Sequence, residues 1–167
     1  MHGLYLVSVW LHILAATVWI GGMAFLVMVI VPTIRRPENR SIAARLVSET
    51  GLRYRTVGWT CLAIMLLTGI FNIGYRGYRW GDVWSGELWQ GAFGTALAWK
   101  LGLVVAVGVL SAVHDFFIGP RAATVWMEAP DSTEALRLRK LASRMGRMTA
   151  LLALAVVFLA VAMLRGW

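Results

Sequence analysis

The chain is poor in cysteine, histidine, proline and charged residues. Of its 167 residues one is cysteine, three are histidine, four are proline and 14% are charged. The single cysteine, Cys61, excludes an internal disulfide, and soluble domains usually carry about 25% charged residues. No segment has the residue spacing of a nucleotide-binding loop, a Ser-His-Asp triad or a zinc site. An ordinary soluble domain is therefore not expected.

Apolar sequence is what the chain has in abundance, with 59% hydrophobic residues and a mean hydropathy of +0.71. Four runs, at about 4–32, 57–75, 93–118 and 147–165, are long enough to cross a membrane. A hydrocarbon core of ~30 Å takes about 20 helical residues. Because these spans and their connections use the whole chain, we predict one all-α membrane domain over residues 1–167, a four-helix bundle. The first span lacks the basic flank and cleavage site of a signal peptide.

Basic residues are unevenly distributed and give the chain a net charge of +8. Loops 33–56 and 119–147 are strongly basic, whereas segment 76–92 is balanced between basic and acidic residues. Basic loops usually face the cytoplasm. The pattern predicts a multi-pass protein of the cell inner membrane with both termini on the outer, periplasmic side. Topology and attraction to anionic lipid explain this charge better than a nucleic-acid partner does.

Shorter features are expected in the connections. Residues 38–50 are predicted to form a short surface helix, and Asp131 with Glu134 three residues later is predicted to cap the helix leading into the fourth span. The outer segment is rich in aromatic residues, which form either a belt at headgroup level or a lid over an outward-facing site. They are Tyr75, Tyr78, Trp80, Trp84 and Trp89.

Three ionisable residues, His12, Lys100 and His114, interrupt the apolar spans. Ionisable groups at membrane depth are costly and usually serve an ion, a proton or a cofactor. Lys100 and His114 share one face of the third span, because 14 residues make close to four helical turns. His12 belongs to an inward seam rich in small residues, as helix contacts in membranes are. That seam also contains Ser8, Ala15, Trp19 and Gly22.

Depth separates these residues into two groups. His12 and Lys100 lie ~12 Å and ~10 Å below the outer surface, at ~1.5 Å per helical residue. His114 lies ~21 Å deeper than Lys100, so a haem ligated by both histidines of one subunit is disfavoured. We name His12 and Lys100 the outer station, and His114 and Asp115, with Cys61 and Met148, the inner station.

Each of these residues also has a purely structural interpretation. His12 can hydrogen-bond across helices, Lys100 can extend its ammonium to the interface, and His114 with Asp115 can be interfacial.

Three segments carry a family resemblance: LHILAATVWIGGMAFLVMVIVP, LLTGIFN and WKLGLVVAVGVLSAVHDFFIGPR. They resemble helices of the copper-resistance protein D (CopD) family, inner-membrane proteins associated with copper uptake or tolerance. The resemblance implies a four-helix member that handles copper. Imidazole and thioether groups suit copper, and Cu(I) favours soft ligands. The candidate metal ligands are His12 and Met163 at the outer station, and His114, Asp115, Met148 and Cys61 at the inner station.

A second resemblance is to the HemJ family of four-helix membrane protoporphyrinogen oxidases. It rests on His12, Trp19, Gly22, Thr68, Gly69 and Lys100, while the arginine expected after Gly22 is absent. It implies haem b near His12, with Lys100, Trp19 and Gly22 as cofactor-binding residues and space left by Gly22 and Ala15. An enzyme of this kind would be a haem-dependent oxidoreductase.

A cofactor-free assembly subunit is the third alternative. The expected partners are the lipid bilayer, a second copy of the chain, or a periplasmic copper or electron-transfer protein.

Overall fold

The computed structural model describes residues 2–165, except the side chains of residues 40, 164 and 165, and it is helical throughout its regular structure. The first half comprises α1 (His2–Phe25), the π-helix η1 (Leu26–Ile30), α2 (Val31–Ile34), the 3₁₀ turn η2 (Pro37–Asn39) and α3 (Arg40–Tyr75). The connection comprises α4 (Trp80–Ser85) and η3 (Glu87–Trp89). The second half comprises α5 (Gly91–Val113), the π-helix η4 (His114–Ile118), α6 (Gly119–Glu128) and α7 (Thr133–Arg165).

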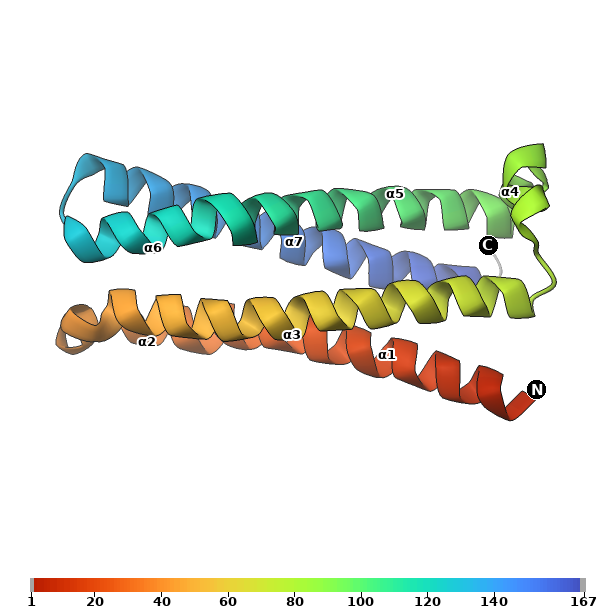
Figure 1. Ribbon diagram of the computed structural model, residues 1–167, viewed down its shortest axis with the longest axis horizontal. Helices are drawn as coiled ribbons and strands as arrows, with labels where there is room; N and C mark the ends of the chain where they lie inside the picture. The colour runs from red at the N-terminus through yellow and green to blue at the C-terminus, as the bar shows by residue number, and fades with distance from the viewer. Residues whose placement is uncertain (1, 166–167) are drawn as a thin grey trace.

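These elements form two long antiparallel hairpins that lie side by side (Figure 1). One hairpin pairs α1 and α2 with α3, and the other pairs α5 and α6 with α7. We call the end that carries α4 the aromatic end, and the opposite end, with η2 and the α6–α7 turn, the basic end. Four helical stretches are long and apolar enough to cross a membrane, which confirms the predicted all-α bundle. They are His2–Ile34, Ser41–Tyr75, Gly91–Glu128 and Thr133–Met163.

The two basic segments are mainly helical extensions of the spans rather than loops. The predicted separate helix over 38–50 is wrong, because most of these residues form the first turns of α3. No proline occurs between Pro37 and Pro120, so nothing in the sequence stops this helix. The 36 residues of α3 extend ~54 Å, well beyond a ~30 Å hydrocarbon core. The basic end therefore projects out of the hydrocarbon region.

The start of α7 differs from the predicted capping box by one residue. Ser132 is the cap, because its Oγ accepts a hydrogen bond of 3.1 Å from the backbone N–H of Ala135. Glu134 does not reach back to a cap and instead accepts a 2.8 Å hydrogen bond from Arg121. That ion pair ties α7 to α6 near the basic end.

Two π-helical turns occur in equivalent places of the two hairpins. The backbone N–H of Val31 donates to the carbonyl of Leu26, and that of Gly119 donates to His114, five residues back in each case. Pro32 and Pro120 follow directly and have no N–H to donate, so each widened turn ends at a proline. Such turns often occur at functional sites because they re-aim side chains.

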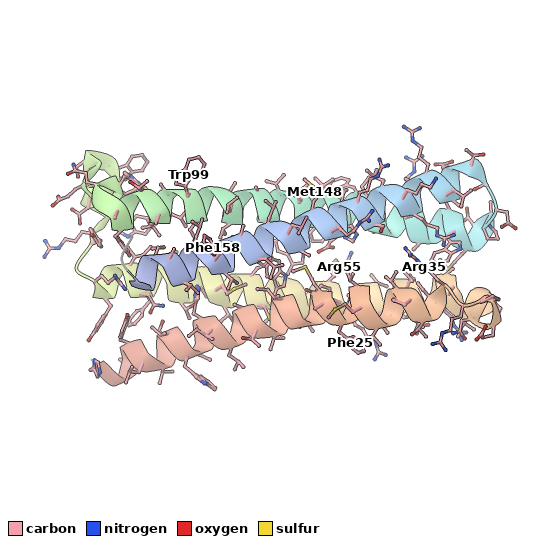
Figure 2. All side chains as sticks on the ribbon, turned by 180° about the vertical axis from the view of Figure 1, so that it is seen from behind. Phe25, Arg35, Arg55, Trp99, Met148 and Phe158 are labelled. Atoms are coloured by element: carbon pink, nitrogen blue, oxygen red, sulfur yellow. The ribbon has the colours of Figure 1, made fainter. Side chains whose placement is uncertain are left out.

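The core lies where the hairpins meet in the middle of the bundle. The buried cluster consists of Ala15, Trp19, Cys61, Val107 and Ala153. It contains Ala15 and Trp19 of the inward seam predicted for the first span, which confirms that face. Large apolar side chains such as Phe25 and Trp99 instead point outward (Figure 2), as expected beside lipid. Trp80 and Trp84 are 72% and 87% exposed at the aromatic end, which favours a belt.

Candidate functional site

His12 is held across the first hairpin by Thr68. The His12 Nδ1 lies 2.8 Å from the Thr68 Oγ1, and that hydroxyl lies 2.6 Å from the carbonyl of Ile64. A threonine hydroxyl has one proton, which goes to this carbonyl, so it accepts the bond from His12. The His12 Nδ1 is therefore the protonated nitrogen, and its Nε2 keeps a free lone pair.

Further polar groups surround His12. Lys100 on α5 lies within the range over which its charge acts on the imidazole. The Ser8 Oγ and the Asn72 Oδ1 are buried without a hydrogen-bond partner among the described residues. Ser8 lies between Tyr5 and His12 on α1, and Asn72 lies between Thr68 and Tyr75 on α3. Since Tyr5 stacks on Tyr75 and His12 bonds to Thr68, both groups lie between these two contacts of the helix pair. The outer station thus holds two oxygen atoms that need a donor or a cation.

The space predicted for a porphyrin beside His12 is already filled. A Cβ built at Gly22 would lie 2.5 Å from the Tyr54 Cε2, so the tyrosine ring occupies the place left by this glycine. The Tyr54 hydroxyl donates a 2.6 Å hydrogen bond to the carbonyl of Trp19. Ala15 and Trp19 are buried in the core cluster. The expectation that Gly22 and Ala15 leave room for haem is wrong, because these small residues allow close helix packing.

The inner station centres on a histidine–carboxylate pair in the π-turn η4. The His114 Nδ1 lies 2.9 Å from the Asp115 Oδ1, and the Trp59 Nε1 donates a 3.0 Å hydrogen bond to the Asp115 Oδ2. The Arg55 guanidinium donates to the backbone carbonyl of Asp115 at 3.2 Å and lies over the ring of Phe116. Both carboxylate oxygens are thus occupied, and the His114 Nε2 remains available.

The other predicted ligands lie apart from this pair. Cys61 is buried in the core cluster, and Met148 is 54% exposed on α7. Neither lines either of the cavities described next. Met163 lies near the end of α7 at the aromatic end. Among the described residues, no group of three or more His, Cys, Asp or Glu side chains is arranged to hold a metal ion.

Two cavities adjoin His114. The small cavity, of about 140 Å³, lies between the inner station and the core and is lined by Trp19, Tyr54, Trp59 and His114, among others. The basic cavity is larger, about 760 Å³, and lies between the two hairpins at the basic end. Figure 2 shows Arg35 and Arg55 on the side of the first hairpin that faces the second, where they line the basic cavity.

Sequence reasoning missed Trp59, Arg55 and Tyr54, which position or border the inner station. The signal was present, because Arg55 and Trp59 are one helical turn apart and share a face. It was overlooked because residues up to 56 were expected to form a loop.

Comparison with known proteins places these features in a family. A family profile described as a domain of unknown function (DUF4149) matches residues 14–131. An uncharacterized protein of Aquifex aeolicus is 32% identical over 114 residues, covering 67% of this chain and 68% of its own length. The copper transport protein CutJ of Bacillus subtilis is 34% identical over 104 residues, which is 62% of this chain but only 17% of CutJ. No solved structure gave a significant match.

Proposed function

The chain belongs to the DUF4149 family, and we propose that it is a CopD-like membrane protein that handles copper ions. In this proposal the chain lies in the cell inner membrane with both termini on the periplasmic side. The ion is cargo, taken up or released through His12 at the outer station and His114 at the inner station. No redox reaction of the metal is part of the proposal.

The state of the two imidazoles is the observation that carries the proposal. Each is hydrogen-bonded through Nδ1, His12 to Thr68 and His114 to Asp115, so each presents Nε2. Metal-binding histidines in proteins almost always donate their other ring N–H to a fixed acceptor, most often a carboxylate or a carbonyl. The His114–Asp115–Trp59 arrangement has this form before any ion arrives.

Copper is the preferred ion because of the likeness to CutJ, whose name describes copper transport, over 62% of this chain. Imidazole, thiol and thioether groups suit copper, and soft sulfur ligands favour Cu(I). The Asp115 carboxylate offsets the positive charge of an ion at His114. Lys100 opposes a cation at His12, so the inner station should bind copper more tightly.

The core cluster lies between the stations and would have to open for an ion to pass. Cys61 is the soft ligand in that cluster, and it is buried with Trp19 and Val107. In the proposal Cys61 serves a passing Cu(I) ion, and Met148 near the middle of α7 and Met163 near its end are secondary ligands.

Titration of the purified protein with Cu(I) against a competing chelator tests the proposal, together with copper accumulation in cells. His114→Ala should lower affinity at least tenfold and reduce accumulation, because it removes the better site. His12→Ala should reduce accumulation with a smaller loss of affinity. The third histidine, His2, is exposed and belongs to neither station, so His2→Ala is the matched control.

Two results would contradict copper handling. One is wild-type Cu(I) affinity and accumulation in the double variant His12→Ala/His114→Ala. The other is an equal loss on His2→Ala, which would show binding by exposed imidazole alone.

Haem b is the second candidate cofactor, and the geometry favours it only beside His114. The basic cavity of about 760 Å³ lies within the usual size range of small-molecule sites and is partly lined by this imidazole. A Soret band in the purified protein that shifts on His114→Ala would support haem in place of copper.

A further inference from the structure

The basic cavity has a lining divided between apolar and charged residues. Its apolar wall comes mainly from the first hairpin and from α6, with residues such as Leu26, Ile30, Val31, Ile34 and Trp126. Its charged wall is made of Arg35, Arg55, Arg139, Lys140, Arg144 and Arg147. Among the described residues of this lining, Asp115 alone is acidic. A ligand that fills this cavity must be both apolar and anionic.

Part of the positive charge of the lining has no carboxylate partner among the described residues. The carboxylate of Asp115 is already bonded to His114 and Trp59. Among the described residues, neither Arg35 nor Arg144 forms an ion pair with a carboxylate. Several basic side chains around one hollow repel one another unless an anion lies between them. The cavity therefore fits a phosphate group electrostatically.

The depth of the cavity corresponds to a membrane surface. Arg55 lies about 20 residues, or ~30 Å, along α3 from Tyr75 at the aromatic end. Arg147 lies about 18 residues, or ~27 Å, from the end of α7. If the aromatic belt marks one face of the hydrocarbon core, these side chains lie at the other face, because the core is ~30 Å thick. Basic pockets between helices at this depth bind lipid headgroups.

We propose that the basic cavity is a binding site for one anionic phospholipid, whose phosphodiester lies among Arg35, Arg55 and Arg144 and whose chains follow the apolar wall. The lipid would fill the gap between the hairpins at their basic end. This inference does not depend on copper binding at His114.

Two double variants with the same change of net charge test the site. Arg35→Gln/Arg144→Gln removes two lining guanidiniums. Arg36→Gln/Arg137→Gln instead removes the residue next to Arg35 and one two helical turns before Arg144, and neither of these lines the cavity. Native mass spectrometry of the detergent-solubilised protein, titrated with phosphatidylglycerol, measures binding of the first lipid. Each basic side chain near an anionic lipid is worth about a factor of five. The lining variant should therefore bind about twentyfold or more weakly, and the control variant should bind as the wild type does.

Two further ligands test whether the cavity recognises an anionic lipid, any phospholipid or a free phosphate ester. Phosphatidylethanolamine, which has no net charge, should bind at least tenfold more weakly than phosphatidylglycerol. Glycerol phosphate alone should neither bind at micromolar concentration nor displace the lipid.

The proposal is overturned if both double variants lose binding equally, because the charge effect would then be general. It is also overturned if the two lipids bind equally well or if glycerol phosphate competes fully, since the site would then recognise any phospholipid or a free phosphate ester. A haem found in the cavity by its Soret band would overturn it as well.

Discussion

The half of the bundle that contains His12 and the core differs from the half at the basic end. The difference lies in what occupies the space beside their glycines. Near His12 and the core, three glycines that face a neighbouring helix have their places filled: Tyr54 occupies the space at Gly22, Trp19 that at Gly58, and His12 that at Gly69. At the basic end, Gly51 and Gly146 line the cavity and have no such neighbour within 4 Å. At these positions the helices pack closely near the core and leave a cavity at the basic end.

Because one half is closely packed and the other is open, the two halves suit ligands of different size. The closely packed half suits a small ion at His12, because side chains fill the spaces beside Gly22, Gly58 and Gly69. The open half can hold a larger molecule, because its walls are charged helices that extend beyond the hydrocarbon core. The contrast also separates the two histidines, since the charge of Lys100 acts on His12 whereas His114 is hydrogen-bonded to a carboxylate.

The strongest test of this comparison is the sidedness of the two ends, because its result is all or none. In a chain with Cys61 replaced by alanine, Ser85→Cys should react completely with a membrane-impermeant maleimide added to intact spheroplasts. Ser41→Cys, at the basic end, should react only after the membrane is broken. Both serines are exposed, so access through the protein is equal. Labelling of Ser41→Cys in intact spheroplasts would reverse the orientation derived from arginine distribution.

The next largest effect is the loss of Cu(I) affinity when the hydrogen-bond partner of His114 or of His12 is replaced. Asp115→Asn should weaken Cu(I) binding by about 10- to 100-fold, the usual cost of losing a carboxylate partner of a metal ligand. Thr68→Val, which keeps the side-chain shape but removes the acceptor for His12, should weaken it less, because the outer station is the weaker site. Chelator competition measures both variants. A larger loss on Thr68→Val would make His12 the principal ligand.

Packing in the closed half gives a somewhat smaller effect. Gly22→Ala places a methyl group against the Tyr54 ring, which is fixed by its bond to the carbonyl of Trp19. Overpacking of this kind costs about 1–3 kcal/mol. Gly21→Ala is the matched control, since a Cβ there meets nothing within 4 Å. Denaturant unfolding in mixed micelles should show a lower free energy of unfolding for Gly22→Ala only.

The sequence was sufficient to predict the spans and their inward faces. The length of the apolar runs determined the number of helices, and spacings of three and four placed Ser8, Ala15 and Trp19 inside, where they are buried. The common depth predicted for His12 and Lys100 agrees with the charge of Lys100 acting on the imidazole. These features depend on local periodicity and on the thickness of a bilayer.

The basic cavity could not be predicted in the same way. It depends on α3 continuing without a break from Arg40 into its span, whereas the sequence predicted a separate surface helix over 38–50. The helix leading into the fourth span was predicted, and α7 confirms it. The cavity also depends on the two hairpins separating at that end, which is a property of tertiary packing. The Trp59–Asp115 hydrogen bond joins residues 56 positions apart, and no local pattern reports such a pairing.

The smallest expected effect lies in the open half, where Gly51→Ala sharpens the comparison with Gly22→Ala. A Cβ at Gly51 would point into free space, and alanine is favoured over glycine within a helix by up to about 1 kcal/mol. The free energy of unfolding should therefore stay unchanged or rise slightly, in the same assay that shows a loss for Gly22→Ala. Lipid binding should persist, because a methyl group removes little of the cavity volume of about 760 Å³. A loss as large as that of Gly22→Ala would mean that the hairpins close on Gly51 in the membrane, and the basic end would then be packed like the other half.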